Sequence, residues 1–295
     1  MTYFHLSILV CLCVLLGRAA FADEAQPLRV PAGFVAAPGT TAEPHSGTGY
    51  ALTIVHEQTQ IELVFIPAGT FQMGSPENEP GRAANEGPAH TVRITRPFYM
   101  GKTEVSQEQW TRLMGPDRLQ GARFPDWAAN RYKGEQKPAV GLSMADCDAF
   151  MKKAGACLRL PTEAEWEYAC RAGTRTAYGF GDSEAKLSEH AWNRENAGGE
   201  LHPVGQKPPN AWGLHDIHGN VFEWCSDRLG SDYYANSPEA DPTGDPAARF
   251  HVLRGGSFIS SAPYCRAAFR HFGQPLHEEG TTHLSDYGFR VVRGE

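Results

Sequence analysis

The stretch NAWGLHDIHGNVFEW, residues 210–224, decides the fold of this chain. Within it, Asp216 and Glu223 lie on either side of a turn that contains Gly219. Calcium and similar hard cations take about six to eight oxygen ligands, drawn from carboxylates and backbone carbonyls together. A glycine turn between two acids can direct carbonyls inward, although the spacing is not that of an EF-hand loop. The spacing alone also fits a turn with solvated acids, so both interpretations stay open.

Helix starts precede this stretch. The segment RLPTEAEWEYACRAGT, residues 159–174, contains Thr162 followed by Glu165, which is the Thr-x-x-Glu pattern of a capping box. Ser106 opens a Ser-x-x-Gln pattern, and Ser143 stands before a further run as an N-cap residue. In each case the hydroxyl can accept a hydrogen bond from a free backbone N–H of the first turn. We therefore predict helices that begin after these three residues.

Strand patterns occupy the region before the helices. Two β-rich runs, residues 61–66 and 70–74, flank Pro67-Ala68-Gly69 and predict a hairpin. Residues 90–100, HTVRITRPFYM, alternate like a further strand. After about residue 172, glycines, prolines and aromatics dominate, and no repeat of fixed spacing is present. We predict loops and short strands around buried Trp and Tyr in that half.

The N-terminus predicts export. The apolar run Leu6–Leu16 is too short to span a bilayer, and the small-residue pattern at residues 20–22 is typical of a signal-peptide cleavage site. We therefore assign residues 1–22 to a Sec-type signal peptide and expect a periplasmic protein with no membrane anchor after cleavage. Residues 23–50 are rich in Pro, Ala, Gly and Thr and predict a flexible segment. Residues 51–295 form the predicted domain.

Charge and glycine patterns exclude some ligands. The formal net charge of the chain is −7, and no basic stripe is present to neutralise phosphates, so we expect no nucleic-acid partner. No Gly-rich dinucleotide fingerprint occurs, so a bound NAD or flavin is not implied. We expect a monomer.

Several motifs on both sides of the opening stretch extend it into an ordered series. In chain order the series contains FIPAGTFQMGS (65–75), TEVSQEQW (103–110), RLPTEAEWEYACRAGT (159–174), NAWGLHDIHGNVFEW (210–224), VLRGGSF (252–258) and DYGFRVVR (286–293). From about Ile61 to Arg293 this series resembles the formylglycine-generating enzyme family, also called the sulfatase-modifying-factor family. The resemblance implies an α+β fold related to C-type lectins, with little regular secondary structure.

The same resemblance gives the acidic loop a role, because members of this family bind structural calcium there. It implies Asp216 and Glu223 as side-chain ligands, with the carbonyls of Gly219 and Val221 as backbone ligands. Asp216 stands where the family commonly has Asn, which keeps an oxygen ligand and adds charge. His218, inside the loop, is expected to be exposed and to have no role.

The thiol pair of the family is incomplete. Formylglycine generators oxidise a sulfatase cysteine with two active-site thiols that bind copper. Counted from the GGS motif, their positions fall at Ser260 and Cys265, whereas in a gapped loop Cys265 replaces neither; in both cases no cysteine pair of that spacing follows the predicted signal peptide, and Phe222 replaces a neighbouring Trp. Two soft thiolates select Cu(I), whereas one thiolate beside hydroxyls does not make that site. We expect no copper and no copper-dependent formylglycine generation. Arg266 and Arg270 are expected to form structural ion pairs.

The remaining cysteines predict disulfides, because export places the chain in an oxidising compartment. An odd number of cysteines follows the predicted signal peptide: Cys147, Cys157, Cys170, Cys225 and Cys265. The resemblance implies a bridge between Cys170 and Cys265, and Cys147 and Cys157 could form a second, local bridge. Cys265 is thus interpreted as a structural cysteine rather than a nucleophile.

Candidate catalytic residues come from two places. The segment HFGQPLHEEGTTH, residues 271–283, is dense in polar groups and, by the resemblance, borders the substrate groove. Two histidines and a carboxylate could form an iron-binding facial triad, but this spacing matches no strong metal signature. Ser257 matches a pocket serine of the family. We predict that Ser257, His277 and Glu278 orient the substrate and transfer protons.

Among exported members without the thiol pair, the chain is most similar to the member that acts in pyoverdine siderophore maturation. This implies an oxidoreductase-like tailoring enzyme that oxidises the dihydro-chromophore of a peptide-like siderophore precursor, with structural calcium and an undefined electron acceptor. The alternatives are a non-catalytic, calcium-stabilised module that binds a ligand or a protein, since fold does not fix function, and formylglycine generation on sulfatases.

Overall fold

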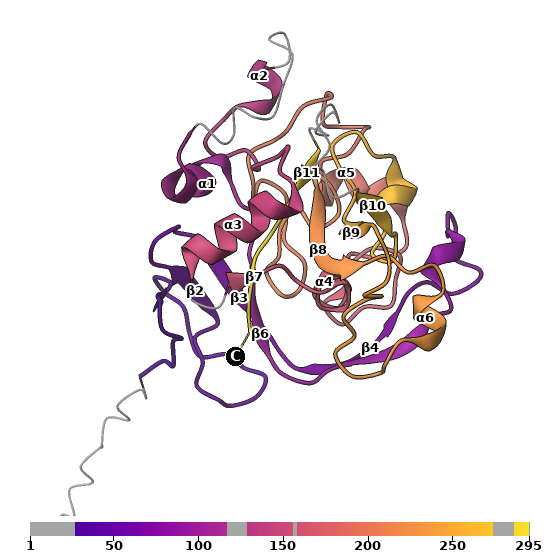
Figure 1. The fold of residues 1–295 in the computed structure, drawn as a ribbon, viewed down its shortest axis with the longest axis horizontal. Helices are drawn as coiled ribbons and strands as arrows, with labels where there is room; N and C mark the ends of the chain where they lie inside the picture. The colour runs from indigo at the N-terminus through magenta and orange to yellow at the C-terminus, as the bar shows by residue number, and fades with distance from the viewer. Residues whose placement is uncertain (1–26, 117–128, 156–157, 274–285, 295) are drawn as a thin grey trace, which may run out of the picture.

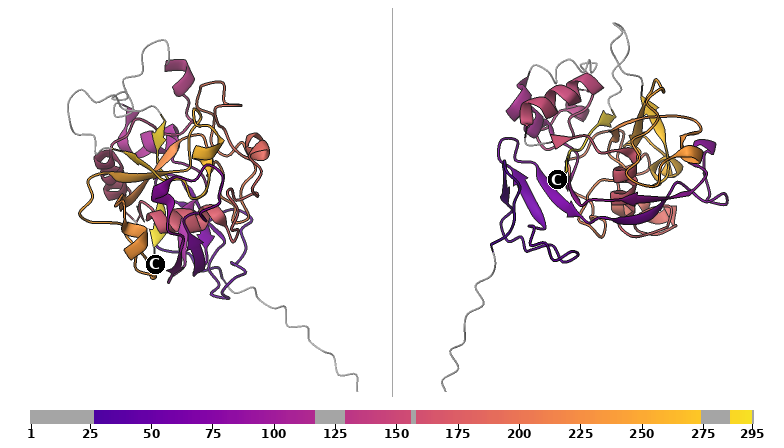
Figure 2. Two further views of the ribbon diagram at one scale, coloured as in Figure 1. Left: turned by 90° about the vertical axis from the view of Figure 1, so that its right-hand side faces the viewer. Right: turned by 60° about the horizontal axis from the view of Figure 1, so that its bottom comes forward.

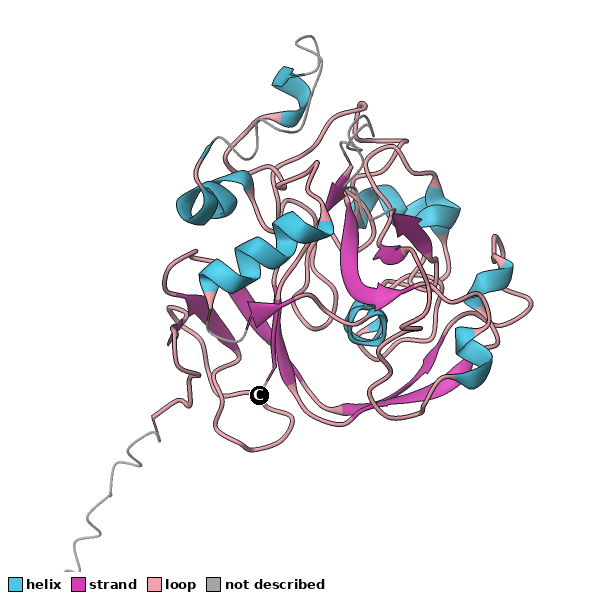
Figure 3. Cartoon of the chain, viewed as in Figure 1, coloured by secondary structure: helices cyan, strands magenta, loops and turns pink. Residues whose placement is uncertain are grey.

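The computed structural model describes residues 27–116, 129–155, 158–273 and 286–294 of the 295-residue chain. Short helices and strands are joined by long loops, and Figure 3 shows that loops form much of the fold. This arrangement agrees with the predicted α+β class of low regular secondary structure. The predicted signal peptide, the site residues His277 and Glu278, and Cys157 lie outside the described residues.

A six-stranded antiparallel sheet joins the early strands to the C-terminal strand, with the order β1-β2-β3-β6-β12-β7. Its strands are β1 (Phe34–Ala36), β2 (Thr53–His56), β3 (Glu62–Ile66), β6 (Phe98–Gly101), β7 (Leu158–Arg159) and β12 (Val292–Gly294). Val292 in β12 lies opposite Met100 on one side and Arg159 on the other. In Figures 1 and 2 the C-terminus accordingly lies beside the indigo and purple N-terminal strands.

A four-stranded sheet carries the part of the fold that matters for function. Its order is β10-β9-β8-β11, in which β11 runs parallel to β8 and the other pairs are antiparallel. The strands are β8 (Phe222–Arg228), β9 (His251–Arg254), β10 (His271–Gly273) and β11 (Tyr287–Gly288). Between β9 and β10 the chain forms a loop and a short 3-10 helix, η5 (Ala262–Cys265). In Figure 1, β9 and β10 lie beside β8, and α4 lies below them.

The three predicted helix starts are confirmed, but the predicted hairpin of residues 61–66 and 70–74 is wrong, because β3 pairs with β2 and β6 and the chain after Pro67 enters a different sheet. Strands β4 (Gly69–Met73) and β5 (His90–Ile94) pair as a two-stranded sheet of their own. The helices are α1 (Gln107–Met114), α2 (Ala129–Tyr132), α3 (Met144–Ala154), α4 (Glu163–Arg171), α5 (Leu187–His190) and α6 (Tyr233–Asn236). Each of α1, α3 and α4 begins after a hydroxyl residue that forms a complete capping box. No helix in the described ranges is long and apolar enough to cross a membrane.

Aromatic packing holds α1 and α3 against each other and against the segment that leads into β12. The rings of Trp110 and Phe150 stack with centroids 5.3 Å apart, and Phe289 meets both edge-on. All three side chains are fully buried, so they contribute the large apolar area that short elements alone do not provide.

The described part of the N-terminal segment, which was predicted to be flexible, contains a paired strand. Residues Phe34–Ala36 form β1 and pair in register with β2, and the Phe34 ring is buried against His56 at 5.1 Å between ring centroids. Glu43 anchors the next turn, because its carboxylate accepts bonds from the backbone N–H groups of His45 and Ser46. Composition indicated a linker here, but one buried aromatic and one edge strand suffice to order the described part of it.

Candidate active site

Two serines and an aspartate form a buried group of oxygen atoms beyond the end of β9, which we call the oxygen cluster (Ser257, Ser260 and Asp286). The Ser257 hydroxyl donates to Asp286 Oδ2 at 2.8 Å and lies 3.1 Å from Ser260 Oγ. The Ser257 backbone N–H donates to Ser260 Oγ at 3.0 Å. All three residues are buried. The cluster is therefore a fixed set of hydrogen-bonding groups that ends in a carboxylate.

Backbone geometry brings the two halves of the oxygen cluster together. Gly255 and Gly256 have φ values of +98° and +76°, a region that favours glycine. A Cβ atom at Gly256 would lie 2.6 Å from Cys265 Sγ, so the turn out of β9 requires glycine there. Asp286 arrives from the opposite direction, and its carbonyl accepts a 2.8 Å bond from the N–H of Phe222 at the start of β8.

Burial changes the acidity of the carboxyl group in this cluster. It raises the pKa of Asp286 above the usual range, and the hydrogen bond from Ser257 opposes part of that rise. A carboxyl group whose pKa moves toward neutrality transfers protons more effectively near neutral pH than an ordinary exposed aspartate. The oxygen cluster thus contains a group suited to acid–base chemistry.

A group of aromatic side chains follows the two serines of the oxygen cluster in the chain, and we call it the aromatic shelf (Tyr264, Phe269 and His271). Tyr264 meets Phe269 edge-on at 5.0 Å, and Phe269 lies nearly parallel to His271 at 6.4 Å, as centroid separations. The His271 ring rests on the buried ring of Phe222 at 4.7 Å, and its Nε2 lies 2.8 Å from the Tyr287 hydroxyl. Burial lowers the pKa of His271. Its ring is therefore held in place and favours the neutral form.

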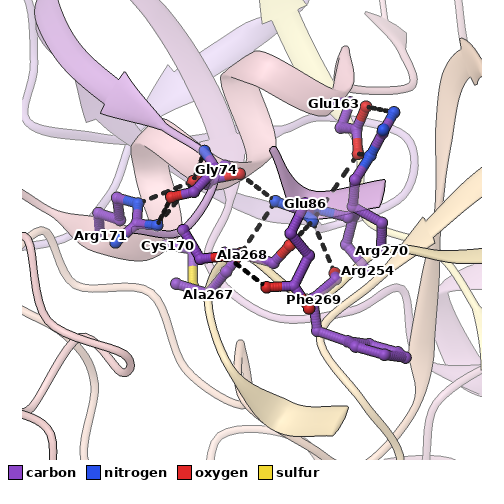
Figure 4. Close-up of polar contacts among 12 residues, drawn as sticks. Gly74, Glu86, Glu163, Cys170, Arg171, Arg254, Ala267, Ala268, Phe269 and Arg270 are labelled. Carbon is purple, nitrogen blue, oxygen red and sulfur yellow. Dashed lines mark hydrogen bonds and ion pairs between the residues drawn. The ribbon is translucent and has the colours of Figure 1, made fainter. Parts of the chain in front are cut away.

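A buried ion-pair network lies behind the shelf and fixes its backbone (Figure 4). The Arg254 guanidinium donates to the carbonyls of Ala267, Ala268 and Phe269, at 2.9, 2.9 and 2.6 Å. It also pairs with the Glu167 carboxylate, which in turn pairs with Arg171 at 2.8 Å. Because both members of the Arg254–Glu167 pair are fully buried, each depends on the other to offset the loss of hydration.

The predicted ion-pair roles of Arg266 and Arg270 are confirmed. Arg270 forms a bidentate pair with Glu163, with both N···O distances 2.7 Å. Arg266 pairs with Glu86 at 2.6 Å and with Glu79 at 2.5 Å. These contacts fix the loop after β4 to the segment that follows Cys265.

Of the three predicted catalytic residues, the described structure places one in this site. Ser257 belongs to the oxygen cluster, whereas His277 and Glu278 lie outside the described residues and stay predictions. Asp286 was missed by sequence reasoning, although it directly precedes the YGFR motif that the series already contained. The available signal was the position of Asp286 directly before YGFR, since this motif returns the chain to the sheet beside the GGS turn.

The predicted bridge between Cys170 and Cys265 is not formed, because both are free, buried thiols. His218 lies beside both residues: its Nδ1 is 2.8 Å from the Cys265 carbonyl and its Nε2 is 3.7 Å from Cys170 Sγ. The expectation of an exposed His218 is wrong, since only 4% of it is accessible. Burial raises the pKa of each thiol to about 12, which makes both poor nucleophiles.

The predicted calcium loop contains a partly suitable set of oxygens. Asp216 Oδ1 is buried with no hydrogen-bond partner in the described structure, while its Oδ2 accepts from Gly205 N–H at 2.6 Å. Both oxygens of Glu223 bond to Arg290 at 2.6 Å, and Oε2 also accepts from Trp166. Asp216 fits an oxygen-seeking cation, but Glu223 faces a guanidinium.

A further buried acid lies near this loop. Both oxygens of Glu104 are buried without a hydrogen-bond partner among the described residues, and burial together with nearby Asp216 raises its pKa well above the usual range. The described residues hold no group of three or more His, Cys, Asp or Glu side chains that could bind a metal. Calcium at Asp216, Gly219, Val221 and Glu223 therefore stays a prediction.

Comparison with known proteins agrees with the motif series. The family described as the sulfatase-modifying factor enzyme 1-like domain matches residues 52–295. A formylglycine-generating enzyme from Streptomyces coelicolor is 31% identical over 312 aligned positions, which cover 87% of this chain and 93% of that protein. The structure of PvdO from Pseudomonas aeruginosa superposes with a TM-score of 0.68 at 27% identity, covering 81% of this chain and 96% of that one. Treponema denticola variable protein 1 gives 0.66 at 28% identity, with 80% and 95% covered.

Proposed function

This chain belongs to the sulfatase-modifying factor enzyme 1-like family, and from that premise we propose that it is an exported enzyme of siderophore maturation. Its substrate is the peptide-like precursor of a pyoverdine-type siderophore. The reaction removes two hydrogens from the dihydro-chromophore and gives the conjugated, fluorescent ring. Two protons and two electrons pass to dioxygen, which becomes hydrogen peroxide.

The observation that carries the proposal is the hydrogen bond between Ser257 and Asp286. By the count from the GGS motif, Ser260 takes the position of the first family thiol, so the chain would present hydroxyls and a carboxylate where the family's copper-dependent members have soft ligands. Such a group can remove a proton from an electron-rich ring, and the resulting anion is more easily oxidised than the neutral ring. Asp286 is the proton acceptor, and Ser257 orients it.

Two further points support this assignment. The chain resembles the exported pyoverdine-maturation member of its family in size, predicted export signal, domain content and the missing thiol pair, and it is similar to PvdO over most of both chains. The aromatic shelf, on the same chain segment as the two serines, offers flat, largely uncharged side chains, which suit an aromatic substrate.

The remaining predicted features have defined places in this proposal. His277 and Glu278 supply a second proton-transfer step, since two protons leave the substrate. Calcium at the Asp216 loop stiffens the frame and takes no part in the chemistry. The predicted signal peptide of residues 1–22 delivers the chain to the periplasm.

The test is conversion of the purified dihydro precursor in air by the mature protein. We expect chromophore fluorescence to appear together with an equal amount of hydrogen peroxide, and Asp286→Asn to lose both. Binding without conversion supports a non-catalytic module instead. Aldehyde formation on a Cys-x-Pro-x-Arg peptide with added copper supports formylglycine generation and overturns the proposal.

A further inference from the structure

We propose that the aromatic shelf is the surface on which the planar, fused aromatic ring of the substrate stacks, and that Phe269 is its central specificity-determining residue. This inference rests on the proposed function for the identity of the substrate, but the shelf itself is a feature of the fold.

The shelf leaves large apolar side chains in contact with solvent. Tyr264 is 47% exposed, and Phe269 and His271 are half-buried. Tyr264 contacts Phe269, Phe269 is nearly parallel to His271, and the buried Phe222 ring packs against His271. Because the Tyr264 and Phe269 planes are 78° apart, a flat fused-ring ligand that stacks on the Phe269 face meets Tyr264 at its edge.

Three connections join the shelf to the oxygen cluster. Tyr264 and the two serines of the cluster lie on one short loop between β9 and β10. The Phe222 N–H donates to the Asp286 carbonyl at 2.8 Å. The residue after Asp286 is Tyr287, whose hydroxyl lies 2.8 Å from His271 Nε2. The shelf and the oxygen cluster are therefore joined through one chain segment after β9 and through the backbone at residues 286–287.

The shelf is also uncharged and held in place before any ligand arrives. The Arg254 guanidinium bonds to the Phe269 carbonyl at 2.6 Å and to the Ala268 carbonyl at 2.9 Å. The Tyr287 hydroxyl restrains the His271 ring, and burial lowers the pKa of His271, which favours the neutral ring. A prearranged aromatic surface loses little conformational entropy when a ligand binds.

The same strand supplies a matched control. Successive residues of a strand point to opposite faces of a sheet. His271 lies opposite Leu253 and contacts Phe222, whereas Phe272 lies opposite Val252 and contacts Phe250 at 5.3 Å between ring centroids. Phe272 is 47% exposed, as Tyr264 is, but it belongs to the other face.

The experiment compares Phe269→Ala and Tyr264→Ala with Phe272→Ala. Dissociation constants are measured by fluorescence titration with a dihydroxyquinoline, a planar fused-ring probe that requires no turnover. Stacking on one aromatic side chain contributes about 1–3 kcal/mol, so each shelf variant weakens probe binding by about 5- to 150-fold. Phe272→Ala binds like wild type. Phe269→Trp, which keeps an aromatic surface, restores binding, and thermal melting verifies that every variant is folded.

Turnover of the precursor separates this inference from the proposed function. With an active enzyme, Phe269→Ala raises KM by the same factor and leaves kcat within about twofold, because it removes binding rather than chemistry. If no precursor is converted, but the probe binds and the shelf variants bind it more weakly, the proposed function is wrong and the assignment of the shelf as a binding surface is supported. If Phe269→Ala and Tyr264→Ala bind the probe as tightly as Phe272→Ala does, the shelf is not the binding surface.

Discussion

The hydroxyl of Ser257 donates a 2.8 Å hydrogen bond to the carboxylate of Asp286, although the two residues are 29 positions apart in the chain. Both side chains are buried, and both follow or precede strands of the same four-stranded sheet. The sheet therefore holds an acid and its hydrogen-bond donor in a fixed relation, and this relation makes distinct predictions about pH and rate.

Replacement of the acid tests its role as base. Asp286→Asn keeps the shape of the side chain but cannot accept the proton, so kcat is expected to fall by about 10²–10⁴-fold. In wild type, kcat/KM rises with pH as Asp286 ionises, at a pH above the usual aspartate range. Ser257→Ala removes the bond that favours the ionised form, so this limb shifts to higher pH. A pH–rate profile that is the same in wild type and Ser257→Ala contradicts the assignment.

The buried pair behind the shelf is expected to dominate stability. Arg254→Met leaves the buried Glu167 carboxylate with Arg171 as its remaining ion-pair partner and removes the donor from the carbonyls of residues 267–269, so it costs about 3–5 kcal/mol in the free energy of unfolding. The exposed pair of Arg112 and Glu108 is the control, and Arg112→Met is expected to cost about 0.5 kcal/mol or less. Urea unfolding measures both values. Equal costs for the two variants would show that Arg254 has no special role.

Calcium is expected to stabilise the chain through the Asp216 loop. Saturating calcium raises the melting temperature, a chelator reverses the effect, and Asp216→Ala removes it, because ligands that bind only the native state stabilise it by mass action. Asp148→Ala, at an exposed acid, leaves the effect intact. Elemental analysis of the purified protein checks the ion directly, and a melting temperature unaffected by calcium and chelator counts against the predicted site.

Asp227 gives stability a pH dependence of its own. Burial, with a smaller effect of nearby Glu163, raises its pKa to about 7, against about 3.9 in the unfolded chain. The native state thus holds the proton more tightly than the unfolded state, so the free energy of unfolding decreases as pH rises from about 4 through 7. Asp227→Asn cannot ionise and flattens this slope. Denaturant unfolding at pH 5 and pH 8 in both proteins measures the difference, and an unchanged slope contradicts the assignment.

The free thiols of Cys170 and Cys265 are expected to resist modification in the native protein. Both are fully buried, and the pKa of each is raised to about 12. Iodoacetamide therefore labels them only after unfolding, as mass spectrometry of peptides from native and denatured samples can show. Recovery of a peptide pair linked through these residues would restore the disulfide that the resemblance implied.

Local patterns predicted those parts of the fold that depend on neighbouring residues. The helix starts after Ser106, Ser143 and Thr162 are confirmed because a capping box is closed within four residues. The fold class is confirmed because the motif series is long and ordered. Strand β1 was not predicted, because its formation depends on pairing with β2 and on burial of Phe34. The amino-acid composition of the segment indicates neither contact.

The site was harder to predict because its members meet only through the sheet. Ser257 was found from its motif, whereas Asp286 acquires its role from the parallel pairing of β11 with β8. The burial of His218 depends on contacts with Cys265 and Gly179, which are distant in sequence. Periodicity and spacing predict local structure. They do not indicate which side chains from distant loops come into contact in the fold.

The most direct test of the account is a single-turnover reaction of the dihydro precursor with wild type and Asp286→Asn in air and without oxygen. The account predicts that wild type in air yields a product two hydrogens lighter, with one hydrogen peroxide per molecule, and that Asp286→Asn or removal of oxygen abolishes it. Equal conversion by wild type and Asp286→Asn would contradict it.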